Sequence, residues 1–578
     1  MKIKSIKAIT ACSLCCNIVA ALVACSDFDD YNSAPVDALA SGNQTLWENI
    51  EQNPQLSDFA SLVKRVGFDA QLNSTRAYTV WAPLNGTFNV ADYQSLNDST
   101  LLQQFVKGHV AQYGHVASGQ LDERVHMLNG KSFAFTGQGA YTFGSIPVNT
   151  VNLPGNNGVM HLINGATRFY PNIYEYVMAN EQDTLLQRFF KQYELTELDT
   201  RNSVKGPVVG GIQTYIDSVL ITSNSLLNTM NARLTNEDST YTFLLPNDHA
   251  YQAMYDKVKP YYNFINTTKV YDVDKFTDAK STVTKQLTVN AEYLSDSLTR
   301  RAIVRNLAFS NNDEYNKWIT ERGEFTDTMR STVRNKFSNP REILSHTTKT
   351  EAMSNGTAHI VDSLAFYPWE TYLPELEINP LYWAYTENSR TRFNFATRTV
   401  NFLDPTGSYF GPDVTELRYL WIYPTGEYAL PQVFIELPEV MAATYKFYCV
   451  FMPTSAKPNL LNFKLNYCNA NGSVVAYNFS SKFLESGKAS DENPKNVNKT
   501  TAFTNNPEVA DTVYLGQFTF PVAYAGLNEM SPCLHITNPI SVFNKADMAT
   551  YTRDVSIAAI IMKPVELAEF EENNKNEE

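Results

Sequence analysis

The sequence contains few of the residues, and none of the motifs, that common catalytic and metal sites require. Only eight of its 578 residues are histidine, and they are widely spaced. No H-E-x-x-H, P-loop, G-x-G-x-x-G or G-x-S-x-G motif is present. His109 and His115 are six residues apart, which is not the i, i+4 spacing of two metal ligands on a helix face. We therefore expect no metal and no cofactor, and a non-enzymatic protein is favoured over a hydrolase.

Cysteine and positive charge are also scarce. Three of the seven cysteines fall in the first 24 residues, and Cys449, Cys468 and Cys533 show no C-x-x-C spacing, which argues against a zinc site. These three either include one disulfide or stay as buried thiols. The formal charge is −14, with 60 acidic against 46 basic residues. An acidic surface repels phosphate backbones, so a nucleic-acid partner is not expected.

The first 42 residues have the composition of a leader and a tether. Residues 1–24 begin with the basic "MKIKSIK" and continue with an apolar run too short for a spanning helix, as in a signal peptide. The run ends in "LVAC", which resembles the bacterial lipobox and implies lipidation of Cys25. Residues 25–42 form an acidic tether that resembles the export signal of Bacteroidetes surface lipoproteins. We expect a lipid-anchored outer-membrane protein exposed on the cell surface; a plain signal peptide and a solvated tether are the alternatives.

Two phrases in the chain resemble each other. "NNGVMHLING" at 156–165 returns as "SNGTAHIVDS" at 354–363. Each phrase has an Asn-Gly pair, a histidine three residues after the glycine and then two apolar residues: Asn157, Gly158 and His161, then Asn355, Gly356 and His359. One such histidine suggests a catalytic base or metal ligand, but its repetition favours structure. Asn-Gly supplies positive φ between paired strands, and the imidazole on the strand can bind a backbone group.

A second pair of phrases and the spacing between them support a duplication. "YTVWAPLNGTF" and "YTFLLPNDHAY" both describe a strand that ends at proline; their matching residues are Thr79 and Thr242, Pro83 and Pro246, and Asn85 and Asn247. His109 lies 52 positions before His161, and Leu307 lies 52 positions before His359. One insertion near 256–299 then accounts for the remaining difference in length. Its polar composition predicts a surface excursion.

The order of these segments resembles the fasciclin domain. "FVKGHVAQY" lies where the family has its second motif, with His109 at the family's histidine position. Leu307 replaces that histidine in the second copy, which puts in doubt any binding role attached to it. The resemblance implies two tandem α+β fasciclin-like domains, at 43–174 and 180–374, the second with "TLLQRFFKQYEL" as its lead helix. In animals, fasciclin domains mediate cell adhesion.

The residue pattern in the last third of the chain is typical of an all-β domain. In "TYKFYCVFMP" Tyr445, Phe447, Cys449 and Phe451 alternate with Lys446 and Tyr448, and proline ends several similar runs. We predict an antiparallel β-sandwich, jelly-roll-like, over residues 375–568. The charged end, 569–578, is expected to be a disordered acidic tail.

Aromatic side chains in this third suggest a sugar-binding platform. The candidate ligand-binding residues are Tyr382, Trp383, Tyr385, Arg392 and Trp421; a core strand explains the same pattern. Two functions remain open. One is adhesion to, or capture of, a glycan or a host or matrix protein. The other is a glycan-binding accessory that works with an outer-membrane transporter in polysaccharide uptake.

Overall fold

The computed structural model describes most of the chain after the tether. The described residues are 42–179, 184–200, 204–217, 220–273, 283–320, 327–385, 393–400, 417–424, 431–452, 456–479 and 502–575. Cys25, the leader, the tether and Arg392 lie outside them. The chain divides into two compact units. The first ends at Tyr176 and also takes in Thr235–Ser239 and Ala352–Asn355, and the rest of the chain forms the second.

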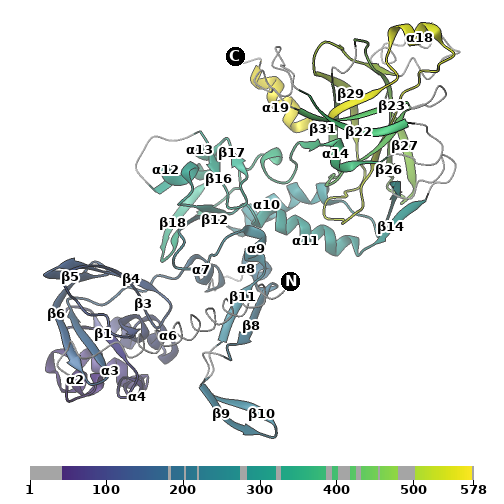
Figure 1. Ribbon diagram of the computed structural model, residues 1–578. Coiled ribbons are helices and arrows are strands. Elements are labelled where there is room, and N and C mark those ends of the chain that lie inside the picture. The colour runs from purple at the N-terminus through teal and green to yellow at the C-terminus, as the bar shows by residue number, and fades with distance from the viewer. Residues whose placement is uncertain are drawn as a thin grey trace, which may run out of the picture. The chain divides into compact units, whose positions relative to one another are not determined.

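The first unit is built on a seven-stranded sheet with the order β2-β1-β7-β6-β5-β4-β3 (Figure 1). Its strands are β1 (Tyr78–Pro83), β2 (Val110–Gln112), β3 (Gln120–His126), β4 (Ser132–Gln138), β5 (Ala140–Phe143), β6 (Ile146–Gly155) and β7 (Gly158–Ile163). β1 and β7 are parallel, with Tyr78 opposite Gly158, and the other neighbours are antiparallel. The phrase at 156–165 is therefore the turn and last strand of a hairpin that ends beside β1.

Side-chain alternation along β1 divides the core of this unit in two. Val80 packs with the helices, whereas Trp81 points to the other face and stacks on Phe143 with ring centroids 4.2 Å apart. The helices are α2 (Leu46–Gln52), η2 (Pro54–Leu56), α3 (Ser57–Arg65), α4 (Asp69–Leu72), α5 (Val90–Gln94), α6 (Asp98–Gln104) and η3 (Val106–His109). A capping box between Thr45 and Glu48 starts α2.

The second unit begins with a four-stranded sheet of the order β15-β12-β19-β18. Its strands are β12 (Tyr241–Pro246), β15 (Ala308–Ser310), β18 (Thr347–Met353) and β19 (Gly356–Val361). β12 and β19 are parallel with Tyr241 opposite Gly356, which repeats the register of β1 and β7. Phe243 is opposite Ala308 as Val80 is opposite Val110, so Leu307 immediately precedes β15 as His109 precedes β2. The sheet register reproduces the alignment of the two phrases.

The helix that leads into this sheet is not the expected one. The Leu46 N–H at the start of α2 donates to Asn157 Oδ1 over 2.8 Å, and the Ile173 N–H at the start of α7 (Ile173–Ala179) donates to Asn355 Oδ1 over 2.9 Å. α7 therefore takes the place of α2, and "TLLQRFFKQYEL" forms the following helix, α8 (Leu185–Lys191). The prediction of the lead helix is wrong, because it selected α8 instead of α7. The helical spacing of apolar residues is stronger in α8 than in α7.

Further helices and short strands complete this half of the second unit. The helices are α9 (Leu226–Met230), α10 (Asp248–Val258), η4 (Lys259–Tyr262), α11 (Ala291–Val304), η6 (Glu314–Asn316), α12 (Lys317–Thr320), α13 (Pro340–Ser345) and η7 (Pro368–Glu370). The two-stranded sheets are β8 (Glu194–Leu198) with β11 (Leu220–Asn224), β9 (Val204–Val209) with β10 (Ile212–Asp217), β13 (Thr267–Tyr271) with β14 (Thr284–Thr288), and β16 (Met329–Arg330) with β17 (Lys336–Phe337).

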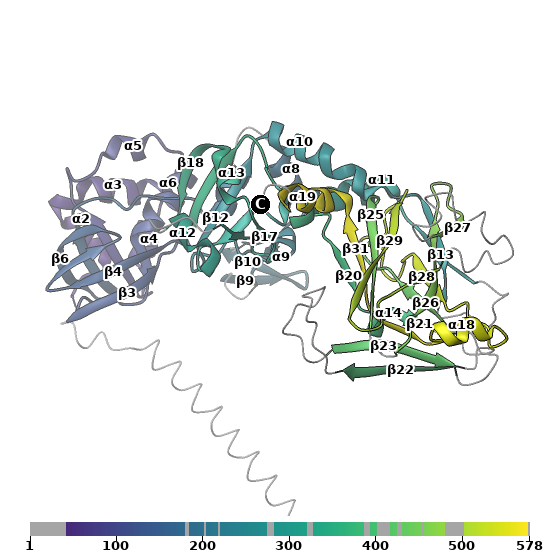
Figure 2. The same ribbon diagram turned by 90° about the horizontal axis from the view of Figure 1, so that it is seen from above.

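The C-terminal part contains two six-stranded antiparallel sheets (Figure 2). One has the order β22-β23-β31-β25-β29 with β20 also on β31, and the other β21-β24-β30-β26-β27 with β28 on β26. The strands are β20 (Leu376–Ile378), β21 (Ala384–Tyr385), β22 (Phe393–Val400), β23 (Leu417–Pro424), β24 (Gln432–Glu436), β25 (Thr444–Phe451), β26 (Leu460–Cys468), β27 (Val474–Asn478), β28 (Phe503–Thr504), β29 (Asp511–Thr519), β30 (Cys533–Thr537) and β31 (Val555–Pro564). Phe451 of one sheet meets Phe463 of the other, and the predicted inward residues of β25 are buried.

The described part of the polar insertion packs against the C-terminal sheets, which differs from the surface excursion expected for it. Its hairpin, β13–β14, lies against the second of these sheets, where Val273 and Tyr271 pack with Phe434 and Cys533. The Lys269 N–H also donates to Cys468 Sγ over 3.5 Å. The composition misleads because polar residues of this hairpin are buried as well: Thr268 and Asp272 are 1% and 3% exposed, and Lys285 Nζ lies 4.0 Å from Asp272 Oδ1 and 3.5 Å from Glu436 Oε1 of the sheet.

The end of the chain is ordered beyond the expected boundary of the tail. Residues 569–575 belong to α19 (Val565–Lys575), so a disordered tail over 569–578 is wrong for that part. Phe570 packs on Tyr367 and Trp369, with ring centroids 5.3 and 4.8 Å away, and these contacts hold the charged helix. Two shorter helices are α14 (Pro380–Trp383) and α18 (Lys545–Thr550). Across the described residues, no helix combines the length and apolar character needed to span a membrane.

Candidate ligand-binding groove

Two histidines of the first unit are held in place by backbone groups on both sides of the ring. His109 Nδ1 lies 2.8 Å from Phe105 O, and His109 Nε2 accepts from the Thr167 N–H over 3.0 Å. His161 Nε2 lies 2.8 Å from the carbonyl oxygen of His115. Burial lowers the pKa of His109 and of His161 to about 4. Both rings are therefore neutral at physiological pH and serve the hydrogen bonding of the fold.

The other motif residues also make contacts within the fold. Thr79 Oγ1 donates to Tyr113 O over 2.7 Å, and Thr242 Oγ1 donates to Asn311 Oδ1 over 2.9 Å. Pro83 and Pro246 end β1 and β12. Asn85 Oδ1 accepts from the Asp58 N–H, and Asn247 Oδ1 caps α10. His359 is half-buried, its Nδ1 lies 3.4 Å from Thr347 Oγ1, and burial lowers its pKa.

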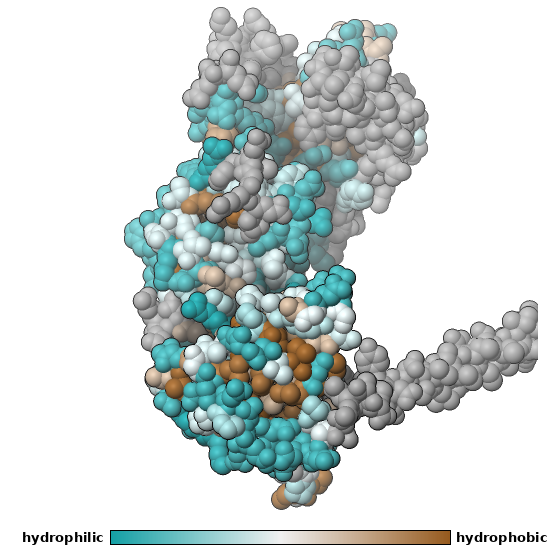
Figure 3. Space-filling view, turned by 90° about the vertical axis from the view of Figure 1, so that its left-hand side faces the viewer, coloured by the Kyte–Doolittle hydropathy of each residue, from teal (hydrophilic) through white to brown (hydrophobic). Residues whose placement is uncertain are grey.

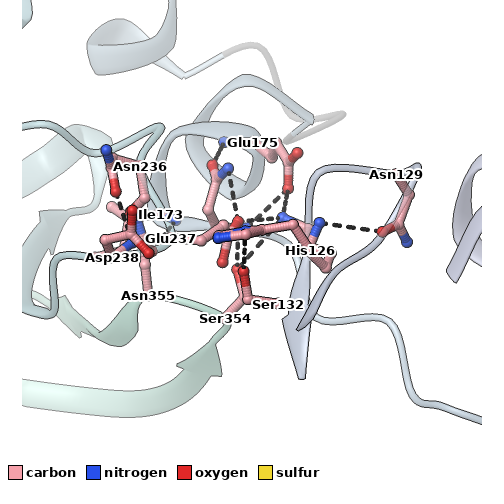
Figure 4. Close-up of polar contacts among 12 residues, drawn as sticks. His126, Asn129, Ser132, Ile173, Glu175, Asn236, Glu237, Asp238, Ser354 and Asn355 are labelled. Atoms are coloured by element: carbon pink, nitrogen blue, oxygen red, sulfur yellow. Dashed lines mark hydrogen bonds and ion pairs between the residues drawn. The ribbon is translucent and has the colours of Figure 1, made fainter. Parts of the chain in front are cut away.

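A buried lysine joins four segments of the first unit. Lys131 Nζ, 3% exposed, lies 2.5 Å from Glu175 Oε2, 2.9 Å from Glu237 Oε1 and 3.3 Å from Ser354 Oγ. Figure 4 shows the side chains of Glu175, Glu237 and Ser354 converging on this point. Since all three ammonium protons have an acceptor, the cluster is a structural joint with no free group for a ligand.

A cavity lies on the outer face of the sheet that contains β25, β29 and β31. Its volume is about 360 Å³, within the range of small-ligand pockets. The floor is formed by Lys446 and Tyr448 of β25, Thr512 of β29, and Ile561 and Lys563 of β31; Glu375, Ala568, Glu571, Glu572 and Lys575 complete the lining. The cavity is therefore a groove between the sheet face and α19, and we call it the β25–α19 groove.

Strand pairing explains why these side chains share one face. Tyr448 is opposite Tyr514 of β29 and Ile561 of β31, and Lys446 is opposite Lys563. The two lysines therefore lie side by side, which is unfavourable unless carboxylates are near. Lys563 Nζ lies 3.2 Å from Glu375 Oε2 and 2.8 Å from Glu571 Oε2, and these carboxylates offset the repulsion between the two lysines. Burial alone lowers the pKa of Lys563. The hydrogen bonds and negative charges of Glu571 and Glu375 outweigh the effect of burial, so the pKa of Lys563 is raised.

Two polar groups of the β25–α19 groove have no partner in the fold. The Thr512 hydroxyl oxygen is buried and makes no hydrogen bond. Among the described residues, Lys446 forms no ion pair, unlike its neighbour Lys563. A buried hydroxyl without a partner costs free energy, and a ligand oxygen that reached it would remove that cost. The half-buried ring of Tyr448 adds an apolar surface, and burial raises the pKa of its phenol.

Apart from Arg392, the residues selected from the sequence for ligand binding lie on three elements, α14, β21 and β23. Tyr382 lies on α14 and is exposed, and β21, which contains Tyr385, belongs to the sheet of β24. Trp421 is on β23 of the other sheet, where its indole Nε1 donates to Asp554 Oδ2 over 3.0 Å and its ring packs on Tyr423. The side chains of Trp383 and Tyr385, and all of Arg392, lie outside the described structure. A role for these residues in binding stays a prediction.

The part of the chain that the structure describes contains no cluster of histidine, cysteine and carboxylate side chains able to hold a metal ion. Cys449, Cys468 and Cys533 are buried free thiols, which settles the alternative left open by the sequence. Burial raises the pKa of Cys533 to about 12, above the range in which a thiol reacts readily.

In a comparison with known protein families, one family model matches part of the chain. Residues 54–166 match the family model described as Fasciclin domain, so the chain contains a fasciclin domain there. The match ends beside the repeated phrase and includes His109 and His161. It covers the larger part of the first unit and leaves the β25–α19 groove outside. A search of curated proteins finds no match.

Similar solved structures include a FAS1 domain pair from the insect cell adhesion molecule fasciclin I, with 12% identity and a TM-score of 0.19, covering 56% of this chain and 99% of that one. Another is the CBM22-2 xylan-binding domain of Paenibacillus barcinonensis Xyn10C, with 8% identity and a TM-score of 0.17, covering 33% of this chain and 98% of that domain. A family 22 carbohydrate binding module of Clostridium thermocellum Xyn10B has 14% identity and a TM-score of 0.15, covering 31% and 89%. These scores are too low to carry an argument about function.

Proposed function

We propose that this chain is a non-enzymatic binding protein held on the outer surface of a bacterial outer membrane by lipid on Cys25. The fasciclin domain at 54–166, an adhesion-related family, supports a binding role. The second sheet, with its repeated register and its Asn355 cap, supports a second fasciclin-like domain that begins at α7.

The ligand in this account binds in the β25–α19 groove. The observation that carries the proposal is the buried, unpartnered hydroxyl of Thr512 in the same groove as the unpaired ammonium of Lys446. Both groups suit a ligand rich in oxygen, since a hydroxyl can donate to it and an ammonium can donate to several oxygens at once. The Tyr448 ring offers the apolar face on which a sugar ring stacks.

The second candidate function is glycan capture for a polysaccharide uptake system with an outer-membrane transporter. It is favoured by the aromatic side chains of the same sheet face, where Tyr448 lies against Tyr514 and Trp421 against Tyr423. Adhesion through a host or matrix protein does not require this aromatic face. Sugar binding therefore separates the two functions.

A glycan array tests both functions. The whole chain from residue 26 is the right protein, because a fragment from 375 would lose the hairpin that covers Phe434 and Cys533. We expect binding to an oligosaccharide that Tyr448→Ala weakens at least about tenfold, while Tyr382→Ala on α14 leaves it unchanged. The reverse pattern would place the site at α14. No binding to any glycan, together with binding to a matrix protein, would leave adhesion as the function.

A further inference from the structure

An arm of two β-ribbons projects from the second unit between α8 and α9. The chain leaves at β8, continues into the hairpin β9–β10 and returns along β11 (Figure 1). At its base the Ser225 N–H donates to Tyr193 O over 3.3 Å, so the two ends of the arm meet. The hairpin turn is Gly210-Gly211, and both glycines have positive φ, as a two-residue hairpin turn requires.

The arm is an addition that the fold does not need. In the first unit, residues 66–77 connect α3 to β1, whereas residues 192–240 connect α8 to β12. The two sheets nevertheless have the same strand register after these connections. Long connections of this kind are usually functional or disordered, and this one is folded.

Exposed apolar side chains are concentrated on the arm. They are Leu195 (54% exposed), Val208 (62%), Val209 (62%), Ile212 (72%) and Ile221 (52%). Val209 and Ile212 are opposite each other beside the turn. In Figure 3 the hairpin lies at the lower end of the view, where brown side chains project into solvent. A two-stranded ribbon with this surface is only marginally stable alone and gains from being covered.

The two edges of the arm differ in charge. β8 carries Glu194 and Glu197, and β9 carries Lys205 and Pro207, which are residues that protect an edge from pairing. Ile212–Tyr215 of β10 and Ile221–Asn224 of β11 contain no charge and no proline, and Asp217 at the end of β10 is the one charged residue of these two strands. Among the described strands, β10 pairs only with β9, and β11 only with β8. One side of the arm is therefore blocked and the other is open.

We infer that the open edge of β10 and β11 pairs with the same edge of a second copy of this chain. With Asp217 as its one charge, this edge can lie antiparallel to itself in a register that keeps the two Asp217 residues apart, whereas the edge with Glu194 and Glu197 opposes like charges in more registers. Pairing of two arms converts two marginal ribbons into one wider sheet and covers Ile212 and Ile221. The hairpin has a single lysine, Lys205, and a single aromatic residue, Tyr215, and the chain is acidic, so an anionic membrane is a poorer occupant.

Sedimentation velocity on the whole chain from residue 26 tests the pairing. We expect a concentration-dependent dimer between about 1 and 100 μM, the range of weak interfaces. Thr222 of β11 and Thr196 of β8 form a matched pair, since they are directly opposite each other with hydroxyls 3.2 Å apart. Thr222→Lys places an ammonium group on the paired edge of each copy and should weaken the dimer at least about tenfold, whereas Thr196→Lys on the opposite edge should change it less than about twofold.

Replacing Leu195–Ser223 by two glycines gives the second variant, because the flanking Glu194 and Asn224 are strand partners. It should be monomeric, and unchanged hydrogen exchange in β12 and β19 shows that it is folded. A chain that is monomeric up to about 100 μM, or a dimer that survives the deletion, overturns the inference. Equal effects of Thr222→Lys and Thr196→Lys also contradict it, as would arm-dependent binding to phosphatidylglycerol vesicles by a monomer.

Discussion

At the scale of single residues, Gly158 and Gly356 are required by a close approach of backbones. Gly158 has φ +147°, and a Cβ there would lie 1.9 Å from Tyr78 O. Gly356 has φ +141°, and a Cβ would lie 1.9 Å from Tyr241 O. In both sheets the glycine is opposite the first residue of the parallel partner strand. The glycine of the repeated phrase therefore sets the distance between two strands.

Gly158→Ala should lower the unfolding free energy of the first unit by at least about 2 kcal/mol. The alanine must adopt a positive φ, and its methyl group must displace the β1 backbone. Gly86→Ala is the control, since Gly86 also has positive φ but has no atom within 4 Å of a Cβ. The measurement is urea unfolding followed by hydrogen exchange in 78–83 and 158–163. Equal losses in the two variants would show that conformation alone, and not the contact, requires glycine.

The buried histidines predict acid sensitivity. The folded pKa of His109 and His161 is about 4, below the ordinary value, so the unfolded chain takes up protons first as the pH falls. Their contribution to the free energy of unfolding is complete above about pH 6.5 and is lost as the pH falls towards 4. By pH 4.5 the loss should be about 2 kcal/mol per histidine. Hydrogen exchange in β1 and β7 at pH 7 and 4.5 measures this loss.

His109→Leu should reduce this pH dependence, and leucine is an informed choice because Leu307 has the equivalent place before β15. The exposed His126→Gln is the control and should leave the slope unchanged. If His109→Leu keeps the full slope between pH 7 and 4.5, then His109 is not a source of the acid sensitivity.

Residue patterns reveal repetition more readily than they reveal a site. Asn157, Gly158 and His161 could be selected from the sequence because their spacing returns unchanged around His359. The Thr512 hydroxyl could not, since its lack of a partner depends on neighbours far away in the chain. Lys446 and Tyr448 were visible as the outward positions of β25, but nothing in the alternation indicates that α19 covers them.

At the scale of elements, the hairpin β13–β14 packs against the C-terminal sheets, although it lies in the sequence between β12 and β15. Val273 and Tyr271 cover Cys533, and the Lys269 N–H binds the sulfur of Cys468. Cys449 is buried on β25, in the other sheet, and is not part of the cluster that Tyr271 and Val273 form with Cys533. The hairpin therefore protects two of the three thiols.

This arrangement predicts thiol reactivity. In the whole chain all three cysteines should react slowly with a disulfide reagent, because burial raises their pKa. In a fragment beginning at 375, Cys468 and Cys533 should react at least about tenfold faster, while Cys449 stays protected and serves as the internal control. Unchanged protection of Cys533 in a folded fragment would contradict the packing of the hairpin.

Element lengths were harder to predict than element types. The matched 52-residue intervals lie after the arm in the sequence, so they give no sign of the long connection between α8 and β12. The β-sandwich alternation was clear, and Tyr445, Phe447, Cys449 and Phe451 are buried as predicted. α19 was missed because "EFEENNKNEE" has the composition of a solvated tail, and only its contacts through Phe570 show otherwise.

At the scale of the whole molecule, the account depends on lipid at Cys25. Cys25→Ser should abolish incorporation of labelled palmitate and move the protein from the outer-membrane fraction to the soluble fraction, because acyl chains supply the membrane affinity. Reversal of Asp27, Asp29 and Asp30 to lysine should keep the lipid but reduce digestion by protease added to intact cells. Full membrane retention of the Cys25→Ser protein would exclude lipid anchoring.

The most direct test of the central claim is calorimetric titration of an oligosaccharide selected by the array into Thr512→Val. Valine has the shape of threonine but lacks the hydroxyl that is buried without a partner. The variant should be at least as stable as the parent chain and should bind the ligand about tenfold or more weakly. If its affinity is unchanged, the ligand does not reach the β25–α19 groove, and the site proposed for this protein is wrong.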